Sequence, residues 1–196
     1  KRNKNMKTLT ILGSDIVAMR YFVATMENPI MHLHEVLIKF QNFSAFLEAG
    51  DGFTMGKLTL PYSGSVPGKI YSEEFKDSFR KYLLPTDWLK KIKKTDILTI
   101  SNDMVSLNGE EPVSLRDGFR YLSTEKKYQY CISRSEPQVI GEYCPSELIK
   151  FSKFARARNE TLLSLFPRLH QNGDKLARVW FSHMPEFEGM VTPLVF

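Results

Sequence analysis

Turn signals recur along the chain between runs that are rich in β-branched and aromatic residues. They are Asp51-Gly52, Ser101-Asn102-Asp103, Asn108-Gly109 and Asn172-Gly173. Short turns rich in Gly, Asn and Asp favour the tight reversals of antiparallel hairpins. The runs FSAFLEA and FTMGKLTL flank the first turn, and DILTI and MVSL flank the second. These recurring turns constrain the fold more than any other feature of the sequence, because they predict a largely antiparallel sheet.

Two segments have helical periodicity instead. The first opens at Ser72, a good N-cap, and the second starts near Pro145, a favoured first helical residue. Their apolar stripes are formed by Phe75, Phe79, Tyr82 and Leu83 in the first and by Leu148, Ile149, Phe151, Phe154 and Ala155 in the second. The basic residues outside these stripes are Lys76, Arg80 and Lys81 in the first and Lys150, Lys153, Arg156 and Arg158 in the second. Both segments therefore predict amphipathic helices with a basic face.

The remaining segments complete an α+β pattern of antiparallel sheet with two amphipathic basic helices. Residues 8–25, 34–40 and much of 113–143 are strand-like, and the chain closes on two more apolar strands. DWLKKIKK, which starts at Asp87, is predicted as a short turn. A strand-rich region over residues 1–68 and helix–strand repeats over residues 69–196 are the expected division.

Positive charge is concentrated in three stretches, although the formal net charge is only +5. Residues 1–7 carry four basic groups and no acid, and residues 69–94 and 146–178 each have an excess of four. Such segregation creates a surface field that attracts polyanions. It favours double-stranded DNA as a partner, although long cationic side chains also serve simply to solvate helix faces.

Several catalytic and metal-binding motifs are incomplete. Gly64 and Gly68 resemble a phosphate-binding loop, but three residues separate them instead of four, and Ile70 follows Lys69. His32 and His34 have no further ligand spaced to complete a metal site. No serine lies in a nucleophile-elbow context. We therefore expect no metal site and no cofactor.

One catalytic arrangement is retained as an alternative. Asp117, Glu125 and Lys127 form a D…E-x-K pattern, in which two carboxylates would hold Mg²⁺ and the lysine would position the attacking water. The same residues also suit a solvated hairpin edge. A Mg²⁺-dependent nuclease is thus a second hypothesis beside a non-enzymatic DNA-associated protein.

The location of the protein is predicted from two features. No apolar run approaches the roughly 18 residues needed to cross a bilayer, so we expect no membrane association. Cys131 and Cys144 are the only cysteines and give no disulfide framework. We expect reduced thiols in the cytoplasm, or in the interior of a host cell if the protein is viral.

Four segments resemble parts of the DNA sliding clamps, the processivity factors of DNA polymerases. In residues 68–83 followed by 95–109, a strand-introduced helix precedes a strand hairpin, and residues 139–159 repeat the entry from strand to helix. Residues 173–196 are similar to the last strands of a bacterial clamp. Together these segments cover about half of the chain.

The resemblance implies a clamp-like tether in DNA replication. Clamps of this kind form oligomeric rings, and basic helix faces meet the phosphate backbone without reading sequence. In this chain the matching residues are Lys76, Arg80, Lys81, Lys150, Lys153 and Arg156. The resemblance also implies a partner site near the C-terminal strand.

The chain ends in an apolar segment that is short of charge. If its edge is open, Met190, Val191, Leu194 and Phe196 form a patch for a second copy or a replication protein. The alternative is that the segment lies inside the sheet as ordinary core. A third functional hypothesis is a phage or mobile-element protein that binds a host protein.

Overall fold

The computed structural model describes residues 8–25, 34–41, 44–60, 80–84, 86–101, 103–117, 142–158, 168–172 and 176–194. Its helical segments are α1 (Gly13–Met19), the 3-10 turn η1 (Arg20–Phe22), α2 (Thr86–Lys91) and α4 (Pro145–Ala157). Its strands are β1 (Thr8–Leu12), β2 (Val36–Gln41), β3 (Ser44–Gly50), β4 (Thr54–Thr59), β5 (Arg80–Leu84), β6 (Ile97–Ser101), β7 (Met104–Leu107), β8 (Val113–Ser114), β9 (Arg116–Asp117), β10 (Arg168–Asn172), β11 (Leu176–Phe181) and β12 (Met184–Val191).

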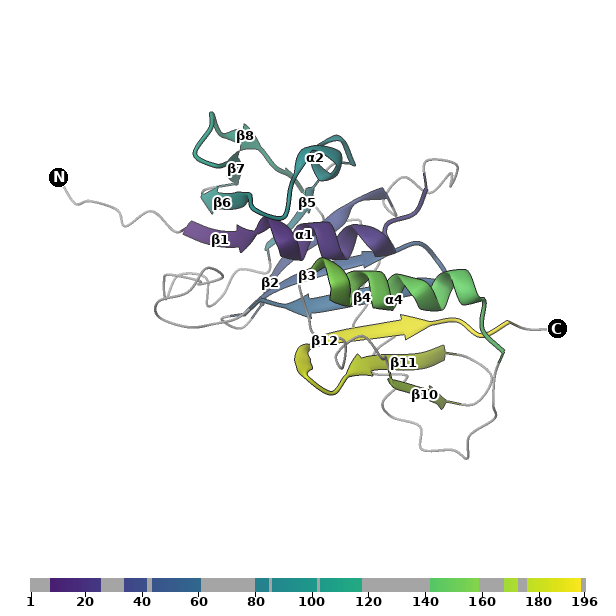
Figure 1. Cartoon of the computed structure of the whole chain (residues 1–196). Coiled ribbons are helices and arrows are strands. Elements are labelled where there is room, and N and C mark those ends of the chain that lie inside the picture. The colour runs from purple at the N-terminus through teal and green to yellow at the C-terminus, as the bar shows by residue number, and fades with distance from the viewer. Residues whose placement is uncertain are drawn as a thin grey trace.

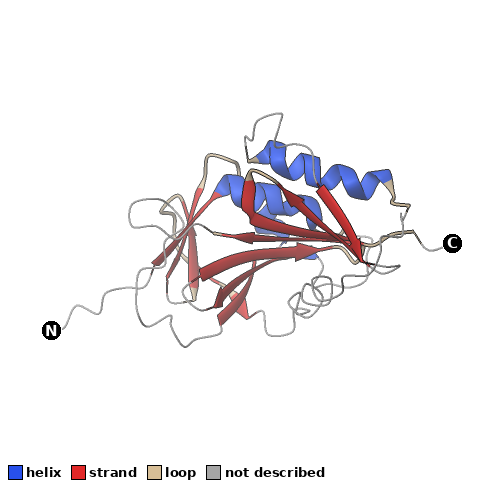
Figure 2. Ribbon diagram, turned by 90° about the horizontal axis from the view of Figure 1, so that it is seen from below, coloured by secondary structure: helices blue, strands red, loops and turns tan. Residues whose placement is uncertain are grey.

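The strands form two antiparallel sheets. The smaller has the order β1-β6-β7-β8, and the larger has the order β10-β11-β12-β4-β3-β2-β5-β9. The helices lie along one face of the strands (Figures 1 and 2). The predicted α+β class with a largely antiparallel sheet is confirmed.

A strand–helix–three-strand unit occurs twice in the first 114 residues. The first unit is β1-α1-β2-β3-β4 and the second is β5-α2-β6-β7-β8. The first strand of each unit lies in the sheet of the other unit, because β1 pairs with β6 and β5 pairs with β2. A third set, α4 with β10, β11 and β12, joins the first unit where β12 pairs with β4.

The β4–β12 seam contains a pair of glycines that admit aromatic rings from the helix layer. Gly56 and Gly189 face each other in register. A Cβ atom would lie 2.6 Å from the Phe22 ring at Gly56 and 2.4 Å from the Phe151 ring at Gly189. The two rings lie 5.1 Å apart between centroids, within a fully buried cluster that also contains Phe154, Phe181 and Phe187. Close packing of rings on the seam ties the N-terminal and C-terminal strands into one core.

Within the described residues, the hairpin predictions are confirmed. Asp51-Gly52 joins β3 to β4, β6 and β7 pair as a hairpin with Ser101 opposite Met104, and Asn108-Gly109 ends β7 with both residues at positive φ. Asn102 and Gly173 of the other predicted turns lie outside the described residues. Strands are also found at the predicted 34–40 segment and at LARVWF in β11. DWLKKIKK is only partly a turn, because α2 begins just before it and continues to Lys91.

Two element predictions are wrong. Residues 13–22, predicted as strand, form α1 and η1, in which the apolar residues Ile16, Val17, Ala18, Met19 and Phe22 are all buried. A helix buried on most sides lacks the polar stripe by which helical periodicity is recognised. Its β-branched and aromatic content therefore resembles that of a buried strand.

The first predicted helix is also corrected in its described part. Arg80–Leu84 is strand β5, whereas residues 72–79 lie outside the described residues. Tyr82 and Leu84 join the main core, and Leu83 packs with Leu37 in a separate cluster. This alternation has the period of a strand. Pairing of β5 with β2 over five residues supplies the contacts that local periodicity could not predict.

The sheets run across the predicted division at residue 68. Strands from both sides of it meet in the β1–β6, β2–β5 and β4–β12 pairs. The boundary itself stays a prediction. No helix in the described part of the chain is long and apolar enough to cross a membrane.

Candidate nucleic-acid interface

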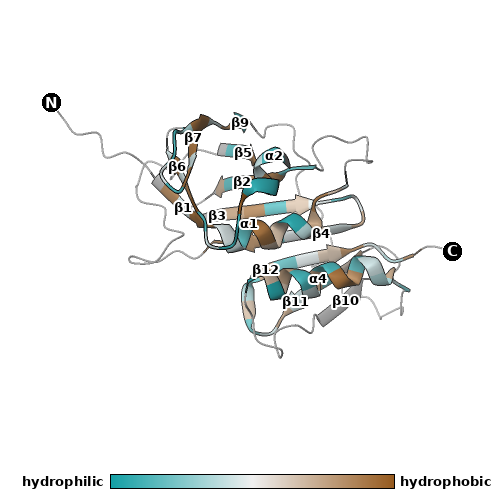
Figure 3. Ribbon diagram, turned by 45° about the horizontal axis from the view of Figure 1, so that its top comes forward, coloured by the Kyte–Doolittle hydropathy of each residue, from teal (hydrophilic) through white to brown (hydrophobic). Residues whose placement is uncertain are grey.

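Helix α4 presents one buried and one exposed stripe. It begins at the predicted residue, with Pro145 in the first turn and Cys144 as N-cap. Phe151, Phe154 and Ala155 are fully buried, and hydrophobic and hydrophilic residues alternate along the helix (Figure 3). Ile149 is 50% exposed, contrary to the prediction that it faces the core. Spacings of four and three residues place it with exposed Lys153 and Arg156 on the solvent stripe.

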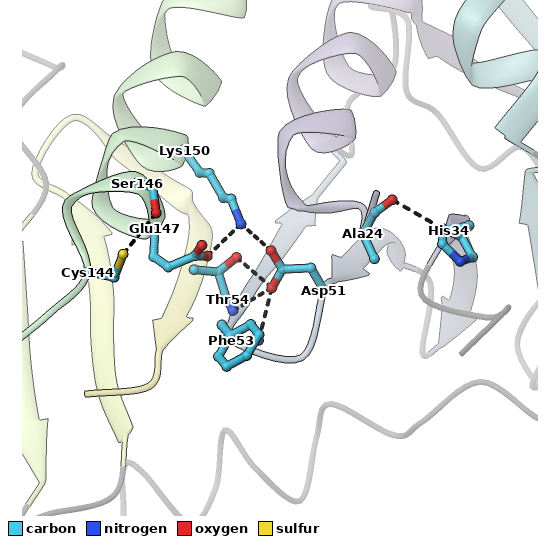
Figure 4. A network of polar contacts seen from close by, with 9 residues as sticks. All are labelled: Ala24, His34, Asp51, Phe53, Thr54, Cys144, Ser146, Glu147 and Lys150. Atoms are coloured by element: carbon cyan, nitrogen blue, oxygen red, sulfur yellow. Dashed lines mark hydrogen bonds and ion pairs between the residues drawn. The ribbon is translucent and has the colours of Figure 1, made fainter. Parts of the chain in front are cut away.

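Lys150 does not belong to this solvent stripe. Its ammonium donates to the carboxylates of Asp51 and Glu147, and its side chain is 21% exposed (Figure 4). Burial acts to lower the pKa of Lys150, but hydrogen bonds to Asp51 and then to Glu147 outweigh it and raise the pKa above its ordinary value. Lys150 thus links α4 to the β3–β4 turn, a structural role that the sequence did not predict.

Asp51 organises that turn. One carboxylate oxygen accepts from the backbone N–H groups of Phe53 at 3.0 Å and Thr54 at 2.8 Å, and from the Thr54 hydroxyl at 3.1 Å. The other oxygen receives Lys150. The hairpin turn is therefore fixed to the N-terminal half of α4.

Arg158 forms a second, more buried link at the opposite end of α4. Its Nε lies 3.0 Å from Asp15 Oδ1 on α1, and its Nη1 lies 2.8 Å from Glu186 Oε1 on β12. Burial raises the pKa of the Asp15 carboxyl, and the Arg158 guanidinium opposes this shift. Arg158, predicted on the basic face, instead joins three elements.

Lys153 and Arg156 remain as the exposed cations of α4. Neither has an ion-pair or hydrogen-bond partner for its side chain within the described ranges. The exposed lysines Lys90, Lys91, Lys93 and Lys94 are here called the lysine segment. One of them reaches α4, because Lys94 Nζ donates to the Arg156 carbonyl at 3.2 Å. These lysines lie in the basic stretch of residues 69–94, but none of them was predicted from the sequence to bind DNA.

The other predicted DNA-binding residues are placed differently or not described. Arg80 and Lys81 lie on strand β5 and not on a helix. Lys76 lies outside the described residues. Their contribution to DNA binding stays a prediction.

The catalytic alternative is also untested. Asp117 is the last residue of β9, where it pairs with Tyr82 of β5. Glu125 and Lys127 lie outside the described residues, as does His32. His34 is buried and its Nδ1 lies 3.2 Å from the Ala24 carbonyl, a contact that suits a core histidine.

The edge-strand prediction for residues 190–196 is wrong in its described part. Strand β12 ends at Val191 and lies between β11 and β4. Met190 is 1% exposed and Val191 is fully buried, so neither can form a surface patch in this fold. Leu194 is 46% exposed, and Phe196 lies outside the described residues. The prediction rested on the apolar composition of the segment, and composition alone does not distinguish a strand that is paired on both sides from an open edge.

Solved structures share this arrangement of strands and helices. A DNA polymerase sliding clamp from Pseudomonas aeruginosa superposes with a TM-score of 0.62 over 97% of this chain and 67% of the clamp, at 9% sequence identity. A Bacillus subtilis sliding clamp gives a TM-score of 0.60 over all of this chain and 66% of its own, at 10% identity. This chain has a sliding-clamp fold.

Further comparisons define the extent of that likeness. A putative DNA polymerase III beta subunit from Eubacterium rectale gives a TM-score of 0.58 at 10% identity, over all of this chain and 67% of the other. No protein-family model matches the sequence, and no curated protein matches it. The chain spans about two thirds of the length of these sliding clamps. The resemblance read from four segments of sequence is thus confirmed at the level of the fold.

Proposed function

We propose that this protein is a non-enzymatic, clamp-like accessory protein of DNA replication that holds duplex DNA through its phosphate backbone. The observation that carries the proposal is the solvent stripe of α4, where Lys153 and Arg156 project from the helix layer of a sliding-clamp fold. The relatives in fold are described as DNA polymerase sliding clamps.

The chemistry of this stripe suits phosphate contacts. Exposed lysine and arginine side chains bind phosphates and release condensed counterions, so each contact steepens the dependence of affinity on salt. Contacts of this kind position a protein on DNA without reading its sequence. Lys150 and Arg158 are committed to carboxylates, so we assign them structural roles and leave backbone binding to Lys153 and Arg156.

The test is binding of a fluorescent duplex of arbitrary sequence at two salt concentrations, with the solution mass measured in parallel. We expect Lys153→Glu with Arg156→Glu to weaken binding more than tenfold. The slope of log affinity against log salt concentration should become shallower by about 2, because each phosphate contact contributes about 0.9 to it. A duplex of unrelated sequence should bind equally well.

The control places two new acidic groups on exposed positions at the other end of α4. Phe53 is 63% exposed and Leu194 is 46% exposed. The Phe53 carbonyl accepts from the Thr192 N–H, and the Leu194 N–H donates to the carbonyl of Glu142, just before α4. Phe53→Glu with Leu194→Glu should leave affinity nearly unchanged. Wild-type protein that binds no duplex at low salt would refute the proposal.

A further inference from the structure

The smaller sheet, β1-β6-β7-β8, has one face turned to the core and one turned away from it. The residues that it buries in the main core are Leu9 and Ile11 of β1, Leu98 and Ile100 of β6, and Val105 of β7. Because successive side chains of a strand point to opposite faces, the residues between them lie on the outer face of the sheet. In Figures 1 and 3 this sheet lies far from β10 and β11.

This outer face carries no charged side chain at the positions that the structure describes. Its residues form three rows across the strands: Leu12 with Ile97, Thr10 with Thr99 and Ser106, and Ser101 with Met104 and Ser114. Ile97 and Ser114 are exposed, and the others are half-buried. Charged residues make up 25% of the sequence, so a sheet face without one is unusual for a surface that meets only water. The corresponding face of the larger sheet carries Lys57, Arg178 and Glu188 instead.

A charge-free face of short side chains suits contact with another protein surface. The centres of protein interfaces are depleted of charged residues. Serine and threonine also lose less side-chain entropy on burial than lysine or glutamate, and their hydroxyls can both donate to and accept from a facing hydroxyl. The protein has a formal net charge of +5, and this face can meet its own copy without bringing like charges together.

The charges at one end of the face are complementary under twofold symmetry. Lys93 of the lysine segment lies on the β1 side of this end, because a Cβ atom on Gly13, which follows β1, would lie 2.1 Å from the Lys93 carbonyl oxygen. Glu110 and Glu111 lie on the β8 side of the same end, between β7 and β8. All three charged residues are exposed. A twofold axis parallel to the strands reverses the strand order in the facing copy, so it places Lys93 of each copy over the glutamates of the other.

We propose that two copies of this chain pack through the outer faces of their smaller sheets, about a twofold axis parallel to the strands. This contact joins two faces, and it does not use the pairing of strand edges. Four strands about 4.8 Å apart and up to five residues long, at about 3.4 Å per residue, give a face of roughly 15 by 17 Å. This area is smaller than the about 800 Å² per partner of a standard interface, so the dimer is weak and forms only at high protein concentration.

The test variant is Thr99→Lys, at the centre of the face. Its matched control is Thr59→Lys, because Thr59 is a half-buried threonine on the face of the larger sheet that carries Lys57. Sedimentation equilibrium measures the mass over a wide range of protein concentration in the absence of DNA. We expect the wild type and Thr59→Lys to approach twice the monomer mass as concentration rises. Thr99→Lys should stay monomeric throughout, because the two copies would bring lysines together.

A mixing experiment separates repulsion across the interface from other effects of the substitution. Thr99→Glu alone should also stay monomeric, because it brings two carboxylates together. An equimolar mixture of Thr99→Lys and Thr99→Glu should dimerise, since opposite charges then lie within reach of each other across the axis. Circular dichroism checks that both variants are folded. If either is not, Ser106→Lys and Ser106→Glu, in the same row, replace the pair with the same expectations.

Three results would overturn the inference. The first is a wild type that is monomeric at every concentration. The second is an assembly whose mass is unchanged in Thr99→Lys, because it would have to form through another surface, such as strand edges. The third is a mixture of the lysine and glutamate variants that stays monomeric. The inference does not rest on the function proposed above, and none of these results bears on DNA binding.

Discussion

Individual residues decide how tightly the two halves of the larger sheet meet. Gly56 and Gly189 are the clearest example, because a side chain at either position would occupy the space of Phe22 or Phe151. Both glycines are needed for the close approach of a ring and not for an unusual backbone angle. The seam therefore depends on the absence of two methyl groups.

Substitution of Gly189 tests this packing. Gly189→Ala should lower the free energy of unfolding by about 1–3 kcal/mol, because the new methyl group overpacks the ring cluster. Urea denaturation followed by circular dichroism would measure the change. Adding Phe151→Leu should recover part of the loss by making room. If Gly189→Ala were as stable as wild type, the ring would have to lie elsewhere.

Cys144 is a second residue with a testable property. A hydrogen bond from the Ser146 hydroxyl, followed by the Ser146 backbone N–H, lowers the pKa of the Cys144 thiol, which lies at the start of α4. A lowered pKa leaves more reactive thiolate at pH 7 to 8 than an ordinary cysteine has. In a Cys131→Ser background, Cys144 should react with a disulfide reagent faster than a model thiol, and Ser146→Ala should slow it. Equal rates with and without the Ser146 hydroxyl would contradict the assignment.

At the scale of elements, charged side chains connect helices to strands. Lys150 joins α4 to the β3–β4 turn, and Arg158 joins α4 to α1 and β12. Lys150 lies in the N-terminal half of the 13-residue helix, and Arg158 is its C-cap. A buried ion pair contributes little in net terms, but removing one partner is costly because the other charge stays buried.

Two arginines on α4 provide a matched comparison of this effect. Arg158→Ala should destabilise the protein by about 3 kcal/mol, since it leaves Asp15 buried without its cation. Arg156→Ala, two residues earlier and exposed, should change stability by less than about 0.5 kcal/mol. Chemical denaturation of both variants under the same conditions measures the difference. Similar losses in the two variants would show that Arg158 is not a structural link.

At the scale of the whole molecule, the larger sheet joins strands from both ends of the chain. The face opposite the aromatic cluster carries charges that alternate from strand to strand, with Lys57 of β4 in register with the buried Glu48 of β3 and with Glu188 of β12. Opposite charges on neighbouring strands favour this register over a slipped one. Because the aromatic cluster packs on the other face, we expect the strands on both sides of the seam to unfold as one cooperative unit.

The two tryptophans report on this cooperativity, because Trp88 lies in α2 and Trp180 lies in β11. In Trp88→Phe the remaining Trp180 reports unfolding around β11, and in Trp180→Phe the remaining Trp88 reports unfolding around α2. We expect transitions followed by tryptophan fluorescence and by circular dichroism to coincide within each variant, as a two-state protein requires. Separate transitions in either variant would show that the seam does not couple the two ends.

The sequence by itself determined the parts of this protein whose causes are local. Turn chemistry at Asp51-Gly52 and Asn108-Gly109 predicted hairpins, and Pro145 with the stripe of Phe151 and Phe154 predicted α4. These signals depend on backbone angles and on spacing within one element, so they can be read without knowing the fold. The α+β class and the resemblance to sliding clamps followed from their order.

Tertiary structure alone decided the rest, because the causes lie in residues distant along the chain. Residues 13–19, predicted as strand, form a helix that is buried in the core, and residues 80–84, predicted as helix, form a strand because they pair with β2. Pairing on both sides turned β12 from a predicted edge into a central strand. Distant residues also determine which basic residues of α4 are exposed. Asp51 binds Lys150 and Asp15 binds Arg158, each from about a hundred or more residues away, so these two cations are partly buried. Lys94 contacts the Arg156 carbonyl from another part of the chain. Spacing within a helix predicts which side chains share a face, but only the neighbours that pack against it determine which of them meet solvent.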